Sequence, residues 1–337
     1  MVHISTDRLR TILSHAHGAA IAVLGDVMVD RYFWGSVSRI SPEAPVPVVD
    51  VESETYHLGG AANVAANIRS LGATPILFGV VGDDATGSLL ERLTVEAGLD
   101  SHGLVTAPRR PTTVKTRVIG NNQQLIRLDR EVRTEVGSKI VEQVVAKLQS
   151  QENLKAIVLE DYDKGFLSDE MITSVVALAN KIEVPVFVDP KRHALTAYSG
   201  VYLYKPNRKE ASDVLGRPLP TADDVVEAGR ELQVKLNCPN ILITLGSSGM
   251  MLFEDQGIVS SVPTRARSVA DVSGAGDTAI ATLAVCVAGK ASVKEASALA
   301  NAAAGVVVSM PGIVSITQEA LVEVIQQDEQ RIPSHTT

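Results

Sequence analysis

The chain of 337 residues has few aromatic residues, few cysteines and a deficit of positive charge. Phe, Trp and Tyr make up only 4% of it although 45% is hydrophobic, so the core must consist mainly of Val, Ile, Leu and Ala. That composition is typical of an α/β sheet covered by helices. Lys and Arg number 31 against 39 Asp and Glu, and the net charge of −8 argues against a nucleic-acid partner. A local group of cations could still bind a phosphorylated substrate.

The two cysteines, Cys238 and Cys286, have no metal-ligand spacing and are expected to be reduced core thiols. Long apolar runs are also missing, because no stretch of 18 apolar residues lacks a charge or a glycine. The first residues do not resemble a signal peptide. We therefore expect a cytoplasmic protein with no membrane partner. With no repeat and no low-complexity linker, we expect a single domain over residues 1–337.

The most informative stretch is Asp271-Val-Ser-Gly-Ala-Gly-Asp-Thr278, which runs into an apolar, helix-forming segment over residues 279–289. Glycines on both sides of Ala275 allow a sharp turn that exposes consecutive backbone N–H groups. Such a helix N-terminus binds phosphate, because its N–H groups are unsatisfied and its dipole is positive there. Asp277 would lie in the first helical turn as a carboxylate able to accept a hydroxyl proton. The stretch thus predicts phosphoryl transfer to an alcohol.

Two other interpretations of this stretch remain open at the level of the motif. The glycines could form an ordinary loop with Asp277 as a helix cap, or they could match the dinucleotide fingerprint G-x-G-x-x-A. The fingerprint normally opens the first strand–helix unit, whereas this one comes late, and Asp277 would face a pyrophosphate. Neither a P-loop nor the protein-kinase motifs occur in the chain.

The rest of the chain alternates strand-like and helix-like segments, which predicts a mostly parallel sheet. Polar residues follow several of these strands, and in a parallel sheet such strand ends meet at one edge. Asp26 and Asp30 close the first strand, expected over residues 21–30, and could bind sugar hydroxyls or simply form a turn. The other strand-end residues are Asp161, Asp189, Lys191, Asn207, Glu210 and Thr244. Paired glycines, Gly59 and Gly60, open a helix that carries Asn63, and they indicate close approach of a ligand or tight helix packing.

Two segments, about 31–57 and 105–130, break the strand–helix rhythm with short alternating strands and, in the second, a turn at residues 120–123. We interpret them as a small β-sheet lid over the site. Side chains two residues apart in a strand face the same way, so Lys115 and Arg117 would form a paired positive surface. These two residues, with Arg39 and then Lys191, are our candidates for holding a substrate phosphate. The alternative is that they are solvated charges of the lid.

The glycine–aspartate stretch and Gly59-Gly-Ala-Ala-Asn63 together resemble the two signatures of the ribokinase-like (PfkB) sugar kinases. Within that family, the resemblance extends to Leu24-Gly-Asp-Val-Met-Val-Asp30, to the lid segments 38–49 and 122–129, and to Asn301-Ala-Ala-Ala-Gly. These segments resemble the members that phosphorylate D-glycero-β-D-manno-heptose 7-phosphate. The similarity covers about residues 20–315. It implies a three-layer α/β sandwich with a β-sheet lid, and a kinase using ATP and Mg²⁺.

The resemblance also implies roles for individual residues. Asp277 would be the base on the anomeric hydroxyl, with Gly274, Ala275 and Gly276 as the anion hole. Asp26, Asp30, Gly59, Gly60 and Asn63 would contact the sugar, with Asp161 also on the substrate side. The nucleotide would be held by Asn207, Arg208, Lys209, Glu210, Thr244, Gly246, Gly249 and Asn301. Glu210 would organise Mg²⁺, and Asp271 with Ser273 would bind a monovalent cation such as K⁺.

Ser273 stands where Thr is common in the family, and Asp163 stands where Ala is expected. Related kinases are often fused to an adenylyltransferase, but no H-x-G-H motif occurs here, so we expect no adenylyltransferase domain. Free edges on the lid sheet favour a homodimer. Two alternatives remain: the same fold acting on ribose, fructose or fructose 1-phosphate, or a nucleotide-binding or NAD protein without phosphoryl transfer.

Overall fold

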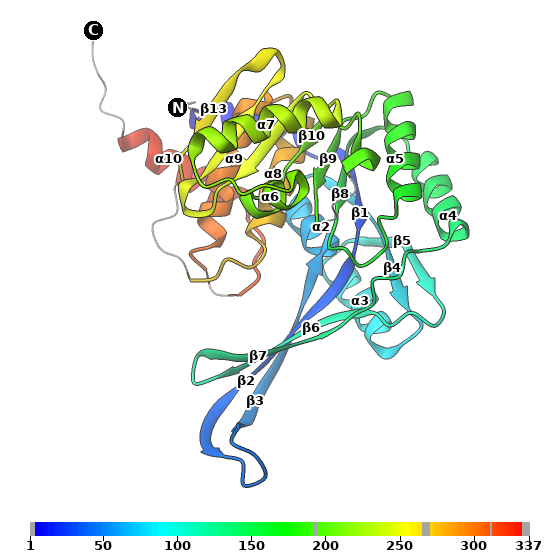
Figure 1. Cartoon of the computed structure of the whole chain (residues 1–337), viewed down its shortest axis with the longest axis vertical. Helices are drawn as coiled ribbons and strands as arrows, with labels where there is room; N and C mark the ends of the chain where they lie inside the picture. Colours follow the sequence, from blue (N-terminus) through cyan, green and yellow to red (C-terminus); the bar gives the residue numbers. More distant parts are fainter. Residues whose placement is uncertain (1–3, 192–194, 265–269, 311, 332–337) are drawn as a thin grey trace.

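The computed structural model describes residues 4–191, 195–264, 270–310 and 312–331. Within these ranges nine strands form one large sheet in the order β13-β12-β11-β10-β9-β8-β1-β4-β5 (Figure 1). The strands from β11 to β5 run parallel, and β12 and β13 are antiparallel additions at one edge. Their bounds are β1 (Ala20–Gly25), β4 (Thr74–Gly82), β5 (Asp100–Ala107), β8 (Leu154–Glu160), β9 (Val186–Asp189), β10 (Leu203–Tyr204), β11 (Asn240–Thr244), β12 (Met250–Phe253) and β13 (Val259–Val262).

The large sheet is covered on both faces because its central strands are apolar on both. In β1, Ile21 and Val23 enter one hydrophobic core while Ala22 and Leu24 enter the other. The first core is closed by α1 (Thr6–Ala16), α2 (Ala61–Ser70), α3 (Ala85–Glu96), α8 (Ala275–Ala288), α9 (Val293–Val307) and α10 (Gln318–Arg331). The second is closed by α4 (Ser138–Gln149), α5 (Asp169–Lys181), α6 (Arg208–Leu215) and α7 (Ala222–Leu236). The predicted three-layer fold is therefore present.

Four further strands form a second sheet, hereafter the small sheet, in the order β3 (Pro47–Gly60), β2 (Val27–Ile40), β6 (Thr113–Gly120), β7 (Gln123–Arg130). Its two central strands, β2 and β6, are parallel to each other, and each outer strand is antiparallel to its neighbour. It projects away from the body of the molecule (Figure 1). Between β6 and β7 both Asn121 (φ 50°) and Asn122 (φ 62°) are left-handed, which is the twist a two-residue hairpin needs. The turn predicted at residues 120–123 is confirmed.

Some predicted boundaries are wrong. The strand expected over residues 21–30 is two strands that belong to different sheets, with Asp26 at the break between them. Residues 105–107, placed in the lid, end the edge strand β5 of the large sheet. Both errors arise because a continuous apolar run carries no signal for a change of sheet.

Most helices begin with an ordinary side-chain cap, as where Ser168 accepts a hydrogen bond from the Met171 N–H at the start of α5. The helices α2, α4 and α8 each begin at a glycine without a side-chain cap, but only those of α2 and α8, Gly60 (φ 59°) and Gly274 (φ 78°), have a positive φ. These two helices pack against each other. No side chain thus caps either N-terminus, although the first N–H of α2, that of Ala61, donates to the Asp26 backbone oxygen at 3.1 Å. No helix in the described part of the chain is both long and apolar enough to cross a bilayer.

Candidate active site

Asp277 lies in the first turn of α8 and is only 4% exposed. Its Oδ2 accepts a hydrogen bond from Asn63 Nδ2 at 2.7 Å, and its Oδ1 accepts one from the Tyr162 hydroxyl at 2.8 Å. Burial raises the pKa of Asp277, while these two donors and the cation of Lys205 act in the opposite direction. The carboxylate is thus held in one orientation and kept out of bulk water, as a general base should be.

The loop before Asp277 has the geometry of an anion-binding site. Gly274 is left-handed and no side chain caps α8. A Cβ at Gly274 would lie 3.0 Å from Asn63 Nδ2, and one at Gly276 would lie 3.3 Å from Asp189 Oδ2. Close packing therefore favours glycine at both positions, and the positive φ favours it further at Gly274. The Ala275 N–H contacts the Val272 backbone oxygen at 3.4 Å, and the N–H groups that follow it in the first turn of α8 fit a phosphoryl group.

A buried charged cluster beside this loop was given no role in the sequence interpretation. Lys205 Nζ lies 2.7 Å from Asp189 Oδ2, and the Lys205 side chain is 3% exposed. Burial raises the pKa of Asp189 to about 6 although Lys205 opposes the shift. Glu160 is 1% exposed, its Oε2 has no hydrogen-bond partner within the described chain, and burial raises its pKa well above the ordinary value. Asp277 is among the charges that contribute to that shift.

The signal for this cluster was present in the sequence. Glu160 and Asp189 are the last residues of β8 and β9, and Lys205 directly follows β10. The carboxyl ends of neighbouring parallel strands meet at one edge of the sheet. Asp189 was recognised as a strand-end residue, but nothing in a single sequence indicated that it would pair with a lysine.

On the side of the small sheet, Asp30 is buried and forms an ion pair with Arg117 from β6. Gly59 pairs with Met28 across the β2–β3 ladder, and a Cβ there would lie 2.2 Å from Asp30 Oδ2. At Gly60 a Cβ would lie 2.2 Å from the backbone oxygen of Asp26. The paired glycines thus make room for Asp30 and allow α2 to start where it presents Asn63.

Lys115 lies next to Arg117 on β6, and its ammonium stands 4.5 Å from the centre of the Tyr162 ring. Burial lowers the pKa of Lys115. Among the described residues no carboxylate is within ion-pair distance of it, whereas Arg117 is occupied by Asp30. Of the two neighbouring candidates on β6, Lys115 is the one without an ion-pair partner among the described residues.

Two predicted substrate residues are used to hold a loop. The carboxylate of Asp26 accepts three backbone N–H groups, from Tyr162 (3.0 Å), Lys164 (3.0 Å) and Phe166 (3.1 Å). Asp161 accepts the Asp163 N–H at 2.8 Å and the Tyr198 hydroxyl at 2.7 Å. The three bonds to Asp26 shape the segment that carries Tyr162. Both carboxylates therefore have structural partners in the protein, and their contact with a sugar stays a prediction.

Arg39 is not brought to Lys115 within one chain, and Lys191 has a carboxylate partner of its own. Arg39 is exposed near the far end of β2, nine residues beyond Asp30, which at a strand rise of about 3.3 Å per residue is about 30 Å. Figure 1 shows β2 extending away from the body in this direction. Lys191 Nζ instead lies 2.6 Å from Glu210 Oε1. The two residues thus belong to different parts of the molecule.

The predicted nucleotide residues gather around the start of α6 and the end of β11. Asn207 and Glu210 form a reciprocal capping box, in which each side chain accepts the other residue's backbone N–H. Asn207 also bridges to Thr244 at the end of β11. In the turn that follows, Gly246 (φ 58°) and Gly249 (φ 86°) are left-handed. The N-x-x-E spacing of Asn207 and Glu210 therefore caps the N-terminus of α6.

The remaining nucleotide candidates flank this group. Arg208 and Lys209 occupy the first turn of α6, where Lys209 pairs with Asp213. Asn301 on α9 donates to the backbone oxygen of Pro263 at 2.7 Å, just after β13. A Cβ on Gly249 would lie 2.1 Å from the Val262 backbone oxygen, so the same turn packs against that segment.

For a cation, the structure offers single carboxylates rather than a cage. Asp271 Oδ1 accepts the Ser273 N–H at 2.8 Å, which shapes the turn before Gly274. Within the described ranges no group of three or more His, Cys, Asp or Glu side chains could hold a metal. Mg²⁺ in kinases commonly takes only one or two carboxylates, with waters and phosphate oxygens completing its shell. Glu210 and Asp189 fit that requirement.

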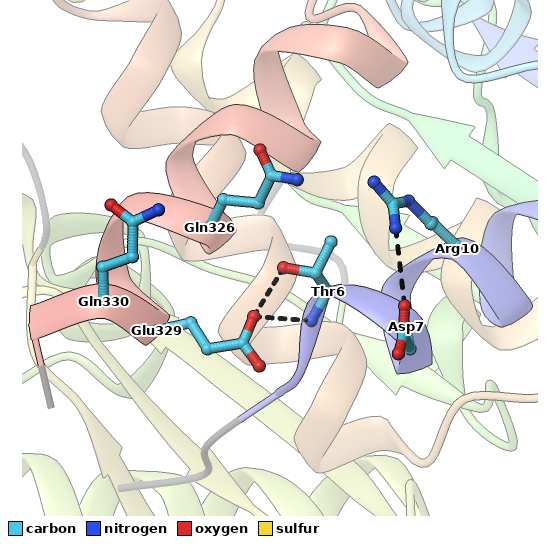
Figure 2. A pocket seen from close by; sticks show the side chains of 6 residues that line it. All are labelled: Thr6, Asp7, Arg10, Gln326, Glu329 and Gln330. Carbon is cyan, nitrogen blue, oxygen red and sulfur yellow. Dashed lines mark hydrogen bonds and ion pairs between the residues drawn. The ribbon is translucent and has the colours of Figure 1, made fainter. Parts of the chain in front are cut away.

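A separate hollow of about 420 Å³ lies between α1 and α10 and is lined by none of the residues above (Figure 2). Its polar groups pair with one another: Glu329 Oε2 accepts both the hydroxyl (2.6 Å) and the N–H (3.2 Å) of Thr6, and Arg10 contacts Asp7 at 3.4 Å. These contacts join the first and last described helices, and we assign the hollow no ligand.

Comparison with known proteins identifies the family. Residues 19–320 match the pfkB family carbohydrate kinases. The chain belongs to that family. The predictions of the family and of a carbohydrate kinase are confirmed.

Among curated relatives, the Bifunctional protein HldE of Geobacter sulfurreducens is 39% identical over 315 residues, covering 93% of this chain and 64% of that protein. The protein of the same name from Azorhizobium caulinodans is 44% identical over 313 residues, covering 92% and 65%. The chain thus spans just under two thirds of the length of these relatives.

Solved structures show the same fold at low sequence identity. Phosphofructokinase-2 from Escherichia coli in complex with substrates and products has a TM-score of 0.77 at 21% identity, covering 92% of this chain and 99% of that one. Ribokinase from Arabidopsis thaliana complexed with ribose and ATP has a TM-score of 0.73 at 22% identity, with the same coverage. The predicted ribokinase-like fold is confirmed.

Proposed function

We propose that this kinase transfers the γ-phosphoryl group of ATP to the anomeric hydroxyl of D-glycero-β-D-manno-heptose 7-phosphate, forming the 1,7-bisphosphate for ADP-heptose and lipopolysaccharide core synthesis. The observation that carries the phosphoryl transfer is the carboxylate of Asp277, held by two donors at the uncapped start of α8. The choice of sugar rests on the lid segments that resemble heptose kinases, on the similarity to the HldE proteins and on the lysine over Tyr162.

The proposed chemistry needs few groups. Asp277 takes the proton of the anomeric hydroxyl, the hydroxyl oxygen bonds to the γ-phosphorus, and the bond from that phosphorus to the β–γ bridging oxygen breaks to release ADP. The N–H groups at the start of α8 stabilise the oxygens of the phosphoryl group in flight, and Lys205 lies close by. Mg²⁺ bound to ATP would neutralise charge on its phosphates, and Glu210 and Asp189 are the carboxylates that would hold it.

A sugar that already carries a phosphate needs a cation some distance from the base. Lys115 meets this need, because it faces the Tyr162 ring on the small-sheet side and has no carboxylate partner among the described residues. Arg117 would act indirectly, by fixing Asp30 for the sugar hydroxyls. A charged hydrogen bond contributes roughly 1.5–3 kcal/mol, so Lys115→Met should raise KM for the sugar phosphate at least about tenfold. KM for ATP should stay nearly unchanged.

The test is an assay with ATP and Mg²⁺ on a panel of sugars, using wild type and Asp277→Asn. Heptose 7-phosphate should be the preferred acceptor, and the variant should lose about 10²–10⁴-fold in kcat because an amide cannot accept the proton. Preference for ribose, fructose or fructose 1-phosphate would replace the proposed substrate. A variant retaining more than about a tenth of the wild-type kcat would refute the role of Asp277.

We also propose that two copies pair through the small sheet. Its outer strands β3 and β7 have unpaired edges, and Val51 (54%), Ile126 (52%) and Leu128 (53%) are exposed on it. Exposed apolar strands at a sheet edge favour association with another strand. Light scattering should report a dimer for wild type and a monomer for Ile126→Lys combined with Leu128→Lys. A wild-type monomer at micromolar concentration would contradict the pairing.

A further inference from the structure

Tyr162 is absent from the residues predicted from sequence, yet it is one of two groups that hold the base. It follows β8 by two residues, in the loop that Asp26 fastens through the Tyr162 backbone N–H at 3.0 Å. Its hydroxyl donates to Asp277 Oδ1 at 2.8 Å, opposite the amide of Asn63 on Oδ2. With a donor on each oxygen, the carboxylate cannot rotate about its Cβ–Cγ bond without losing both bonds.

The same ring touches the small sheet. Lys115 on β6 places its ammonium 4.5 Å from the ring centre, a cation–π distance. A positive charge over a phenol ring draws electron density from the ring and strengthens the hydroxyl as a donor. Burial and the neighbouring Asp277 raise the pKa of Tyr162 well above its ordinary value, so the hydroxyl keeps its proton at working pH. One side chain thus connects the lid to the base.

We infer that Tyr162 is a positioning residue for the base, and that its contact with Lys115 couples the orientation of Asp277 to the small sheet. The inference rests on the proposed function. Tyr162 need not touch the reacting atoms, because its effect passes through the carboxylate it orients. It follows that a sugar phosphate bound to Lys115 would also affect Tyr162, the residue that orients Asp277.

The electrostatic surroundings of Asp277 allow this role to be measured. The groups that face it come from several elements: Asp30 on β2, Asn63 on α2, Glu160 on β8, Tyr162 in the following loop, Asp189 on β9 and Lys205 after β10. Among these, the two hydrogen-bond donors and Lys205 favour the ionised carboxylate. Removing the Tyr162 hydroxyl should therefore raise the pKa of Asp277 and move the acidic limb of the rate profile to higher pH.

The experiment compares the pH dependence of kcat/KM for wild type, Tyr162→Phe and Tyr198→Phe, with sugar phosphate as the varied substrate. Tyr162→Phe keeps the ring under Lys115 and removes only the hydroxyl. We expect its acidic limb to shift upward by about one pH unit and its plateau kcat to fall about tenfold, with KM for ATP unchanged. Tyr198→Phe is the matched control, because it also removes a hydroxyl bonded to a buried carboxylate, that of Asp161 at 2.7 Å.

The control should show the acidic limb of wild type, even if it is less stable to heat. An acidic limb in Tyr162→Phe that coincides with that of the control would overturn the inference, and so would an equal loss of kcat in both variants. These results are distinguishable from failure of the proposed function. If Asp277→Asn stays active, the base assignment fails first; if it is inactive while Tyr162→Phe keeps the wild-type profile, only the positioning role is wrong.

Discussion

The buried pair of Lys205 and Asp189 predicts a stability change whose size depends on pH. Lys205→Met would leave Asp189 without its cation at 2.7 Å, in a site where Glu160 is already buried beside it. Removing one partner of a buried ion pair typically costs about 3–5 kcal/mol, since the remaining charge is neither paired nor solvated. We expect a loss of that size in the free energy of unfolding at pH 8.

At lower pH the loss should be smaller. The folded-state pKa of Asp189 is raised to about 6, so the folded protein holds a proton that the unfolded chain releases near its ordinary value. Stability from this group is therefore present at low pH and declines as pH rises through the folded pKa. In Lys205→Met the folded-state pKa of Asp189 should rise above 6, because Lys205 lowers it in wild type. The free energy of unfolding of the variant should therefore keep falling between pH 6 and pH 8, a range in which the Asp189 contribution in wild type no longer changes.

Urea-induced unfolding followed by circular dichroism at pH 6 and pH 8 measures both effects. Adding Asp189→Asn to Lys205→Met should restore most of the stability, because no unpaired charge remains at that position. Lys209→Met is the matched control, since Lys209 pairs with Asp213 on the surface with its side chain 83% exposed. It should cost less than about 1 kcal/mol. The reasoning would be refuted if Lys205→Met lost the same free energy of unfolding at pH 6 and pH 8. It would also be refuted if the double variant lost as much as the sum of the losses of Lys205→Met and Asp189→Asn.

Three further predictions concern other parts of the molecule. Gly60→Ala should destabilise by more than about 2 kcal/mol in urea unfolding and abolish turnover, because a Cβ would lie 2.2 Å from the Asp26 backbone oxygen at φ 59°; wild-type stability would contradict this. The hydrogen bond to Arg8 is the main cause that lowers the pKa of Glu295 to about 2, so Glu295 contributes stability that is lost as pH falls from about 4.5 toward 2. Glu295→Gln should therefore reduce the loss of stability in acid by about 1–2 kcal/mol, a figure that allows for the partial exposure of the pair. An acid unfolding transition identical to that of wild type would count against the pair. If the Asp271 turn binds a monovalent cation through its oxygens, initial rates should be higher in K⁺ than in Na⁺ at equal ionic strength, and equal rates would remove that site while leaving the kinase intact.

Local patterns in the sequence were sufficient for the catalytic motif and much of the secondary structure. The motif ending in Asp277 predicted a phosphate-binding helix start because its glycines and carboxylate act within a single turn. The helix α5, residues 169–181, is a local feature of this kind, since a Ser168 cap and a regular apolar face are encoded within about a dozen residues. The turn at residues 120–123 followed in the same way from Asn121 and Asn122.

Only the tertiary structure decided which side chains share the site. Asn63 and Asp277 are 214 residues apart, Tyr162 and Asp277 are 115 apart, and Arg117 and Asp30 are 87 apart, so no local pattern relates the members of each pair. The strand order of the two sheets brings them together, and burial then selects their partners, because a charge removed from water must be paired. For the same reason Asp26 fastens a loop, and Lys115 has no carboxylate partner within the described ranges. The sequence shows which residue types are present, whereas their partners depend on which atoms the fold brings within about 3 Å of each other.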